Sequence, residues 1–368
     1  MEIILMHQTF LDGDAIGHDI QGMYDVCKKK NINVFVFCEN NYADIKYQTI
    51  DLNELKKKIK IKSNIVIYHH SIYWELGEKI LHEVNCKVII RYHNITPPHF
   101  FKGYSKRYFE TTNAGRLQTK RLSNESRFFW LSDSNYNNSE VLELGVKSSL
   151  TEVVAPFHKI EHMDQVEVNT ELLNSLIKNS IINVLFIGRV ATNKGHKRIC
   201  QVAKAYKELF GDNFIFWIVG GFDNEISKYN EEIQNYIHQW GLQDNVIFTQ
   251  KIPIETLKSY ILGSDLFLCL SEHEGFCVPL IECQYHKLPV VACQSTAIGE
   301  TLGKEQMLFA TFDEDMIASA IHEVATNKDV SNYIIEKGQE NYYTRFTNDI
   351  LERKFSDFIE RVSGGMVS

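Results

Sequence analysis

The chain alternates short apolar runs with longer amphipathic stretches, and it does so in two successive series. The short runs are rich in Val, Ile, Leu and Phe. They are continuously apolar, a pattern typical of parallel strands that helices cover on both faces. Helical periodicity fills the gaps between them. Two series of this kind predict two doubly wound α/β domains, each built on a parallel sheet.

The first series supplies six candidate strands, at 3–7, 33–38, 64–70, 87–93, 127–133 and 152–157. The second series supplies six more, at 183–189, 214–221, 245–250, 266–271, 289–294 and 307–310. Helical periodicity is clearest at 197–210, 226–240, 314–326 and 348–362.

A polar stretch, 158–181, separates the two series and predicts the domain boundary. We expect a first domain over 1–165, a second over 166–345, and a C-terminal helix within 346–368 that packs back toward the first domain. Ligands of open parallel sheets bind outside the carboxyl ends of the strands. Functional residues are therefore expected just after strands.

The cysteines indicate a reducing compartment. All eight lie outside C-x-x-C pairs, and most fall within apolar runs, as expected for reduced core residues of a cytoplasmic protein. The N-terminus has no basic region before an apolar stretch, so it is interpreted as a first strand and not a signal peptide. No apolar run approaches the ~18 residues that span a bilayer.

Charge is spread unevenly along the chain. The net charge is −8, with +3 over residues 1–160 and −11 over the rest. The lysines at 28–30 are interpreted as a solvated helix face. At 55–62 and 100–122, basic residues alternate with Leu, Ile, Phe and Tyr, which suits an anionic membrane surface as well as a solvated face. We expect no nucleic-acid partner.

Basic residues follow the first strand of the second series, in "FIGRVATNKGHKR" at 186–198. Gly188 ends the strand and lets a ligand approach the backbone. Arg189 offers a planar fork for phosphate oxygens, and Lys194 adds a point charge. The order of residues is not that of a Walker A loop. The pattern predicts a phosphate site, with a merely solvated basic loop as the alternative.

Two acids lie in "SEHEGFCVPLIEC" at 271–283, directly after an apolar strand. Glu274 precedes a helix expected over Val278–His286, and Glu282 lies one turn inside it. Carboxylates accept hydrogen bonds from vicinal hydroxyls. Backbone amides near the start of a helix favour anions, and here these amides belong to Gly275, Phe276 and Cys277. The alternative is a capping acid and a surface acid, which the buried strand disfavours for Glu274.

These motifs resemble retaining glycosyltransferases of family 4. Glu274 and Glu282 fit the E-x7-E signature, and "GRVATNKG" is similar to the G-R-x-x-x-x-K-G element. The similarity covers 182–310 and extends more loosely to 12–20, 91–98 and 131–145. It implies the GT-B fold, with two Rossmann-like domains facing across a cleft. The motifs also resemble those of family members that build bacterial surface polysaccharides such as O-antigen or capsule.

The resemblance implies a role for each matched position. Arg189 and Lys194 would hold the diphosphate of a nucleotide sugar, and Glu274 would grip hydroxyls of the donor sugar. Glu282 would accept hydrogen bonds from the ribose. The remaining donor-binding positions are Gly188, Gly275, Phe276, Cys277 and Val278.

Three further assignments rest on the same resemblance. The nucleobase would lie near Gln250, Lys251 and Ile252, although family members often have Gly at the first of these. Gly17 would leave room for the diphosphate or acceptor. His93 would lie near the reacting sugar, with a structural strand-end histidine as the alternative.

The implied activity is transfer of a hexose, first of all mannose from GDP-mannose, to a glycan or lipid-linked acceptor. UDP-hexoses remain open. We expect no cofactor and no required metal, because Arg189 and Lys194 would neutralise the diphosphate. D-x-D patterns at 12–14 and 313–315 are too short to indicate a metal. A non-catalytic nucleotide-sugar-binding protein, a phosphorylase and an epimerase are the alternatives. A dinucleotide oxidoreductase is poorly supported, because no G-x-G-x-x-G follows a strand.

Overall fold

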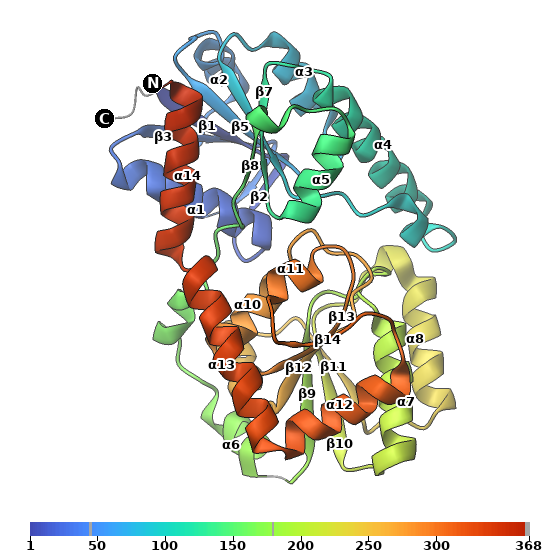
Figure 1. The fold of residues 1–368 in the computed structure, drawn as a ribbon. Helices are drawn as coiled ribbons and strands as arrows, with labels where there is room; N and C mark the ends of the chain where they lie inside the picture. The colour runs from blue at the N-terminus through green and yellow to red at the C-terminus, as the bar shows by residue number, and fades with distance from the viewer. Residues whose placement is uncertain (44–45, 179, 365–368) are drawn as a thin grey trace. The chain divides into compact units, whose positions relative to one another are not determined.

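The computed structural model describes residues 1–43, 46–178 and 180–364. It divides into two compact units (Figure 1). Unit 1 comprises Met1–Pro98, Arg107–His158 and the C-terminal segment from Arg345, and unit 2 comprises His99–Lys106 and Lys159–Thr344. The predicted boundaries were 165/166 and 345/346.

The segment His99–Lys106 was placed in the first domain by prediction, but it belongs to unit 2. The Tyr104 hydroxyl donates to Glu232 at 2.8 Å, and Lys197 donates to the Tyr104 oxygen at 2.7 Å. Ser105 donates to Glu225 at 2.9 Å. These polar contacts, which the local sequence pattern does not reveal, hold the segment on unit 2.

Unit 1 contains a six-stranded parallel sheet in the order β3-β1-β5-β6-β7-β8. Its strands are β1 Glu2–Met6, β3 Asn33–Phe37, β5 Ile65–His70, β6 Lys87–Tyr92, β7 Phe128–Ser132 and β8 Thr151–Val153. Two short strands, β2 Thr9–Leu11 and β4 Asn40–Tyr42, pair separately. Its helices are α1 Ala15–Lys29, α2 Leu52–Lys58, α3 Glu75–Glu83, α4 Lys106–Ser123, α5 Asn135–Glu143 and α14 Asn348–Ser363.

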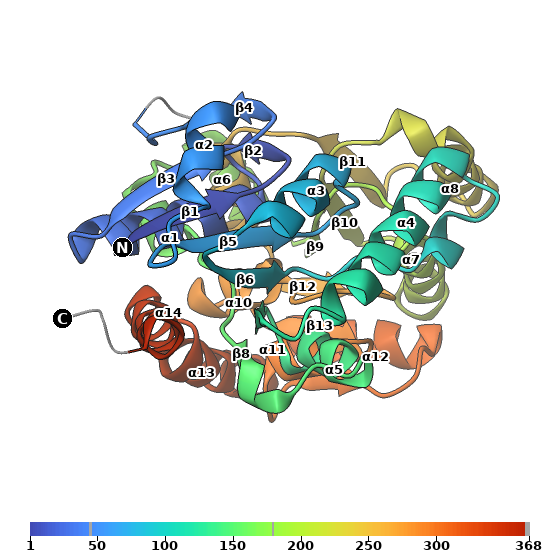
Figure 2. The ribbon, with the colours of Figure 1, turned by 90° about the horizontal axis from the view of Figure 1, so that it is seen from above.

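Helices cover both faces of this sheet (Figures 1 and 2). One face packs against α2, α3, α4 and α5 in a core that includes Leu55, Leu81, Leu122 and Trp130. On the other side α14 packs beside α1, where Lys29 pairs with Glu352 at 2.8 Å. The prediction of a doubly wound sheet is confirmed for this unit.

Unit 2 contains a second six-stranded parallel sheet, in the order β11-β10-β9-β12-β13-β14. Its strands are β9 Ile182–Ile187, β10 Phe214–Val219, β11 Val246–Gln250, β12 Leu266–Cys269, β13 Val290–Cys293 and β14 Met307–Phe309. Its helices are α6 Thr170–Lys178, α7 His196–Phe210, α8 Ser227–Gln239, α9 Ile254–Gly263, α10 Val278–Tyr285, α11 Ile298–Leu302, α12 Glu314–Thr326 and α13 Lys328–Arg345.

The helices of unit 2 form layers on both faces of its sheet (Figure 1). The core on one face includes Leu176 of α6, Ile261 of α9 and Leu280 of α10. On the other face, α7 packs against both α8 and α12. The prediction of a second doubly wound sheet is confirmed. Among the residues that the structure describes, no helix is both long and apolar enough to cross a membrane.

Candidate functional site

The strand order of unit 2 reverses between β9 and β12. The chain runs from β9 outward to β10 and β11, then returns to place β12 on the other side of β9. Ligands of doubly wound sheets bind at such a switch point, outside the carboxyl ends of the strands. Two loops leave the sheet there: the 188–195 loop after β9 and the 270–277 loop after β12. They carry Arg189, Lys194 and Glu274.

Two hydrogen bonds hold these two loops together. The Glu272 N–H donates to the Asn193 carbonyl at 2.8 Å, and the Asn193 side-chain amide donates to the His273 carbonyl at 2.9 Å. Gly195 has a φ of 74°, and a Cβ there would lie 2.1 Å from the Leu270 carbonyl oxygen. Only glycine fits a position with this φ and this close approach. Lys194 is thereby set against the 270–277 loop.

Lys194 and Glu274 form a charged pair at the switch point. The Lys194 ammonium donates to both Glu274 carboxylate oxygens, at 2.7 and 2.8 Å. Lys194 is half-buried and Glu274 is buried. Desolvation is the largest single influence and lowers the pKa of Lys194, but Glu274, Cys277 and Cys269 together outweigh it, so the pKa is raised. The Thr296 hydroxyl holds the backbone of Glu274 in place. It accepts from the Glu274 N–H and donates to the Glu274 carbonyl, both at 2.8 Å. The capping-acid alternative for Glu274 does not describe this geometry.

Arg189 lies in a different environment within the same loop. It follows Gly188 at the end of β9, and its side chain is 62% exposed. Its guanidinium lies 3.4 Å from Asp223, a long contact for an ion pair. An exposed guanidinium with one distant partner can turn toward an anionic ligand at little cost in folding stability.

Glu282 lies on α10, which begins at Val278 as predicted and ends at Tyr285. Cys277 precedes the helix with a φ of 76°, and Pro279 occupies its first turn. The Glu282 side chain is half-buried, and desolvation raises the pKa of its carboxyl to about 7. A solvated surface acid would not show this shift, so the environment favours a functional carboxyl.

The positions flanking Glu274 are also held by the fold. Phe276 is buried, and the Thr301 hydroxyl donates to its carbonyl at 2.7 Å. Gly275 and Val278 are half-buried. The 270–277 loop therefore leads into α10 at Val278 with no intervening segment.

The predicted base-binding residues lie after β11. Gln250 is exposed with a φ of 64°, and its carbonyl accepts from the Gly220 N–H at 3.2 Å. Lys251 is exposed, whereas Ile252 packs against the apolar core. Gln250 and Lys251 are available to a ligand, and Ile252 contributes to packing.

In unit 1, His93 follows β6 and has protein partners at both ring nitrogens. Its Nδ1 lies 2.9 Å from Asp133, and its Nε2 lies 2.9 Å from Nδ1 of His69. The side chain is 6% exposed. Gly17 packs against backbone, because a Cβ there would lie 1.8 Å from the Leu11 carbonyl oxygen. A ligand role for either residue stays a prediction.

A buried charged network surrounds His93, and the sequence analysis did not assign it. Arg91 is fully buried and donates to Asp19 at 2.8 and 3.2 Å, and it pairs with Asp133 at 2.9 Å. Its Nη1 donates to the Val154 carbonyl at 2.7 Å. The sequence feature that could have indicated this network is Arg91, a charged residue inside the apolar run "KVIIRYH". The network joins the three N-terminal segments, 12–20, 91–98 and 131–145, whose resemblance was loose.

A cavity of about 450 Å³ lies in unit 1 between α4 and α5. Charged residues of both signs line it, including Arg116, Lys120, Glu140 and Glu143. Arg116 pairs with Glu140 at 3.0 Å. A cavity of this size with polar side chains of both signs suits a ligand rich in hydroxyl groups.

One aspartate of each D-x-D pattern caps a helix. The Asp14 carboxylate accepts from the Gly17 N–H at the start of α1, and Asp313 accepts from the Met316 N–H at the start of α12. Capping is the ordinary role of Asp at these positions.

Residues 168–341 match the family described as Glycosyl transferases group 1. This segment contains both switch-point loops and α10. Among similar proteins, a 2-deoxystreptamine N-acetyl-D-glucosaminyltransferase of Niallia circulans is 28% identical over 176 residues, 47% of this chain and 42% of that protein. The alpha-1,3/1,6-mannosyltransferase alg2 of Schizosaccharomyces pombe is 22% identical over 257 residues, 62% of this chain and 51% of that protein. The chain spans about half the length of these relatives.

Solved structures resemble the chain over nearly its full length. Anabaena Alr3699/HepE in complex with UDP-glucose has a TM-score of 0.74 at 14% identity, covering 98% of this chain and 99% of that one. Sucrose-phosphate synthase of Thermosynechococcus elongatus has a TM-score of 0.75 at 14% identity, covering 99% and 100%. WaaG, a glycosyltransferase involved in lipopolysaccharide biosynthesis, has a TM-score of 0.71 at 13% identity, covering 97% and 99%.

This chain has the GT-B fold. Within that fold, unit 2 is the domain that carries the family match, and the Lys194–Glu274 pair lies at its switch point.

Proposed function

We propose that this chain is a retaining glycosyltransferase that moves a hexose from a nucleotide-diphosphate sugar to a glycan or lipid-linked acceptor. The observation that carries the proposal is the pairing of Lys194 with Glu274 at the switch point of unit 2, in which Lys194 comes from the same loop as Arg189. This pair supports the proposal because an ammonium can bind a diphosphate and a carboxylate can bind sugar hydroxyls. The family match over residues 168–341 supports the same activity.

In the proposed reaction the bond between the sugar C1 and the diphosphate oxygen breaks, and a bond from the acceptor oxygen to C1 forms on the same face. The acceptor hydroxyl proton passes to the departing phosphate oxygen. Arg189 and Lys194 stabilise the negative charge that develops on the diphosphate. Glu274 and Glu282 bind hydroxyls and do not act as the acid and nucleophile of a hydrolase. No metal is needed for the diphosphate in this scheme.

For the donor we propose GDP-mannose first, and for the pathway the synthesis of a bacterial surface polysaccharide. Mannosyltransferases among the relatives support the sugar, including the serotype-specific WbdA of Escherichia coli, 27% identical over 141 residues. That match covers 38% of this chain and 17% of WbdA. We place the acceptor in the polar cavity between α4 and α5 of unit 1.

The test is a thermal-shift screen across nucleotide sugars, followed by assay of released nucleotide diphosphate with and without acceptor glycans. A ligand that binds the native state raises its melting temperature. GDP-mannose should give the largest shift. A shift without release of GDP under any acceptor condition would favour the non-catalytic binding protein. Formation of a sugar phosphate from inorganic phosphate, or of an isomeric nucleotide sugar, would favour the phosphorylase or the epimerase.

Donor binding should depend on pH through Glu282. Its pKa is raised to about 7 by desolvation, so the carboxyl is protonated below that pH and ionised above it. Ribose hydroxyls donate better to the ionised form, so binding should strengthen as pH rises. If only the ionised form binds, affinity increases about tenfold between pH 6 and pH 8. Calorimetric titration with a nucleotide sugar measures this.

A nucleotide sugar is the suitable ligand because it has no terminal phosphate with a pKa near 6. The control is Glu282→Gln, which should bind more weakly and with no dependence on pH over this range. If that variant keeps the full tenfold change, Glu282 is not the titrating group.

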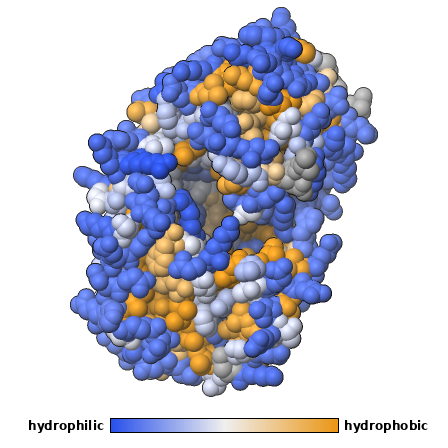
Figure 3. Space-filling view, turned by 180° about the vertical axis from the view of Figure 1, so that it is seen from behind, coloured by the Kyte–Doolittle hydropathy of each residue, from blue (hydrophilic) through white to orange (hydrophobic). Residues whose placement is uncertain are grey.

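We also propose a cytoplasmic protein that associates with an anionic membrane surface. Within 55–62, Lys56, Lys57 and Lys62 are exposed beside Ile61, which is 49% exposed. On α4, Leu117 is 50% exposed near further basic side chains. The aromatic residues at 100–105 pack within unit 2, so they do not support this proposal. On the face shown in Figure 3, hydrophilic side chains cover much of the surface, and hydrophobic side chains gather in several patches.

Flotation with anionic vesicles at low salt should recover the protein in the lipid fraction, and Lys56→Glu with Lys57→Glu should weaken recovery. Electrostatic attraction is strongest at low ionic strength. The matched control is Lys28→Glu with Lys30→Glu, which changes the same charge on a face expected to be solvated. No flotation of the wild type, or equal loss in both variants, would contradict the proposal.

A further inference from the structure

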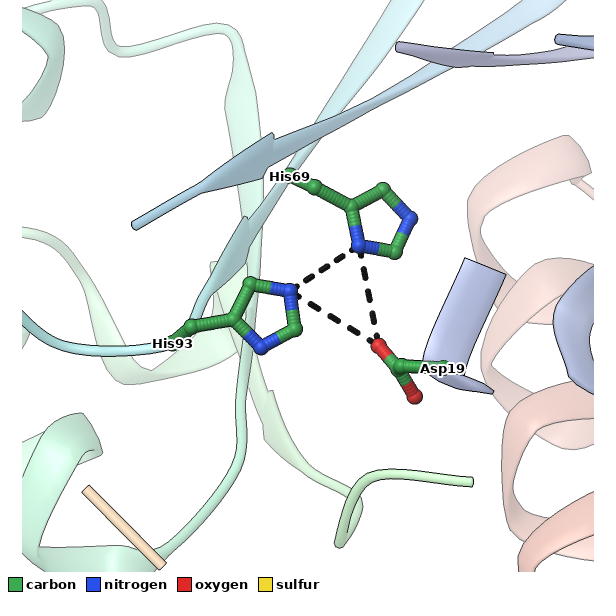
Figure 4. A group of neighbouring side chains, drawn as sticks. All are labelled: Asp19, His69 and His93. Carbon is green, nitrogen blue, oxygen red and sulfur yellow. Dashed lines mark hydrogen bonds and ion pairs between the residues drawn. The ribbon is translucent and has the colours of Figure 1, made fainter. Parts of the chain in front are cut away.

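Three side chains from distant parts of the sequence point toward one another at the carboxyl edge of the unit 1 sheet (Figure 4). Asp19 comes from α1, His69 from the end of β5, and His93 from the residue after β6. The strand order of unit 1 reverses between β1 and β5, so this is the switch point of that sheet. All three side chains are almost fully buried.

The spacing of their ligand atoms fits a metal ion. Nδ1 of His69 lies 2.9 Å from Nε2 of His93, and Oδ2 of Asp19 lies 3.7 and 3.8 Å from these two nitrogens. The point equidistant from three atoms with these separations lies about 2.0 Å from each, and bonds from Zn²⁺ to imidazole nitrogen or carboxylate oxygen are about 2.0–2.2 Å. Two imidazoles and one carboxylate are a common ligand set for first-row transition ions.

The surrounding groups support a cation. Asp133 lies 2.9 Å from Nδ1 of His93, the arrangement in which a carboxylate orients a metal-bound imidazole. Asp19 and Asp133 carry two negative charges against one on Arg91. Arg91 donates to the same Asp19 oxygen, but a carboxylate oxygen has a second lone pair.

We propose that Asp19, His69 and His93 bind a divalent transition-metal ion in unit 1, of the class represented by Zn²⁺. The site is separate from the diphosphate chemistry proposed for Arg189 and Lys194, which needs no metal, and it does not depend on the proposed function. A proton shared by His69 and His93 would also supply positive charge and is the alternative to a metal ion. The metal-bound and protonated states differ in whether the protein binds a metal ion stoichiometrically.

The experiment uses the full chain after removal of metal with a chelator. Zn²⁺ titration against a chromophoric chelator should show one ion per chain with submicromolar affinity, and Zn²⁺ should raise the melting temperature. Co²⁺ should give visible bands typical of nitrogen and oxygen ligands. His93→Gln and His69→Gln should abolish this binding, and Asp133→Asn should weaken it about 10–100-fold.

His70→Gln is the matched control. His70 is the neighbouring buried histidine on β5, its side chain points to the opposite face of the sheet, and it contacts Thr119 at 2.8 Å. This variant should keep wild-type affinity and the Co²⁺ spectrum.

Absence of stoichiometric binding to the wild type would overturn the proposal. So would binding that survives in His93→Gln, or thiolate charge-transfer bands in the Co²⁺ spectrum, since the chain has free cysteines elsewhere. If the buried variants fail to fold, the stoichiometry and Co²⁺ spectrum of the wild type decide the question.

Discussion

Replacing Lys194 with Ala is expected to lower the rate of glycosyl transfer about 10²–10³-fold. Preorganised cations that meet developing charge on a leaving group contribute on this scale. Lys194 is held in place by the Gly195 turn and by both oxygens of Glu274, so its ammonium is preorganised in the switch-point loop. Release of nucleotide diphosphate under saturating donor measures the effect.

The same change should also reduce stability, because Glu274 remains buried without its partner. We expect a loss of about 1–3 kcal/mol, below the value for a fully buried pair because Lys194 is 24% exposed. Lys194→Met with Glu274→Gln should recover stability but not transfer. Lys204→Ala, which removes a lysine with a 40% exposed side chain from the following helix α7, is the control and should leave both unchanged. Transfer near the wild-type rate in Lys194→Ala would exclude the proposed role.

Replacing Arg189 with Ala is expected to reduce turnover at least ~10²-fold while the fold is retained. The side chain is 62% exposed and lies 3.4 Å from Asp223, so its removal breaks little within the protein. The melting temperature should stay within about 2 °C of the wild type. Arg189→Lys should recover part of the activity, because an ammonium supplies charge without the planar fork.

The control for Arg189 is Arg127→Ala, which removes a guanidinium that is 49% exposed in unit 1. It should leave turnover unchanged. If Arg189→Ala transfers sugar nearly as fast as the wild type, the diphosphate is not held by this loop and the proposed mechanism fails.

Much of the fold could be predicted from local patterns. Each of the twelve runs taken as strands overlaps a strand of one of the two main sheets, although the run 152–157 shares only its first two residues with β8, and α12 has the predicted bounds, Glu314–Thr326. Apolar periodicity reports whether a segment is buried on one face or two, and that information lies within a few consecutive residues. The short pair β2 and β4 was missed because each strand has three residues and no apolar run.

The site was predictable where chemistry follows a strand directly. Arg189 and Lys194 follow β9, and Glu274 follows β12. Their position at the end of a strand could be inferred from the motifs. The pairing of Glu274 with Lys194 through both carboxylate oxygens could not be inferred from the motifs. The two residues are 80 positions apart in sequence, and they meet because β12 lies beside β9 in the sheet.

By itself, the sequence determined the elements, the division into two parallel sheets, and the residues that end up beyond strand ends. The tertiary structure alone decided which of those ends are neighbours: the pairing of Lys194 with Glu274, the meeting of Asp19 with His69 and His93, and the membership of His99–Lys106 in unit 2. The physical reason is that the burial of a helix or strand requires apolar residues at a regular spacing, which is visible within a few consecutive residues. The order of strands in a sheet instead arises from packing among elements far apart in sequence.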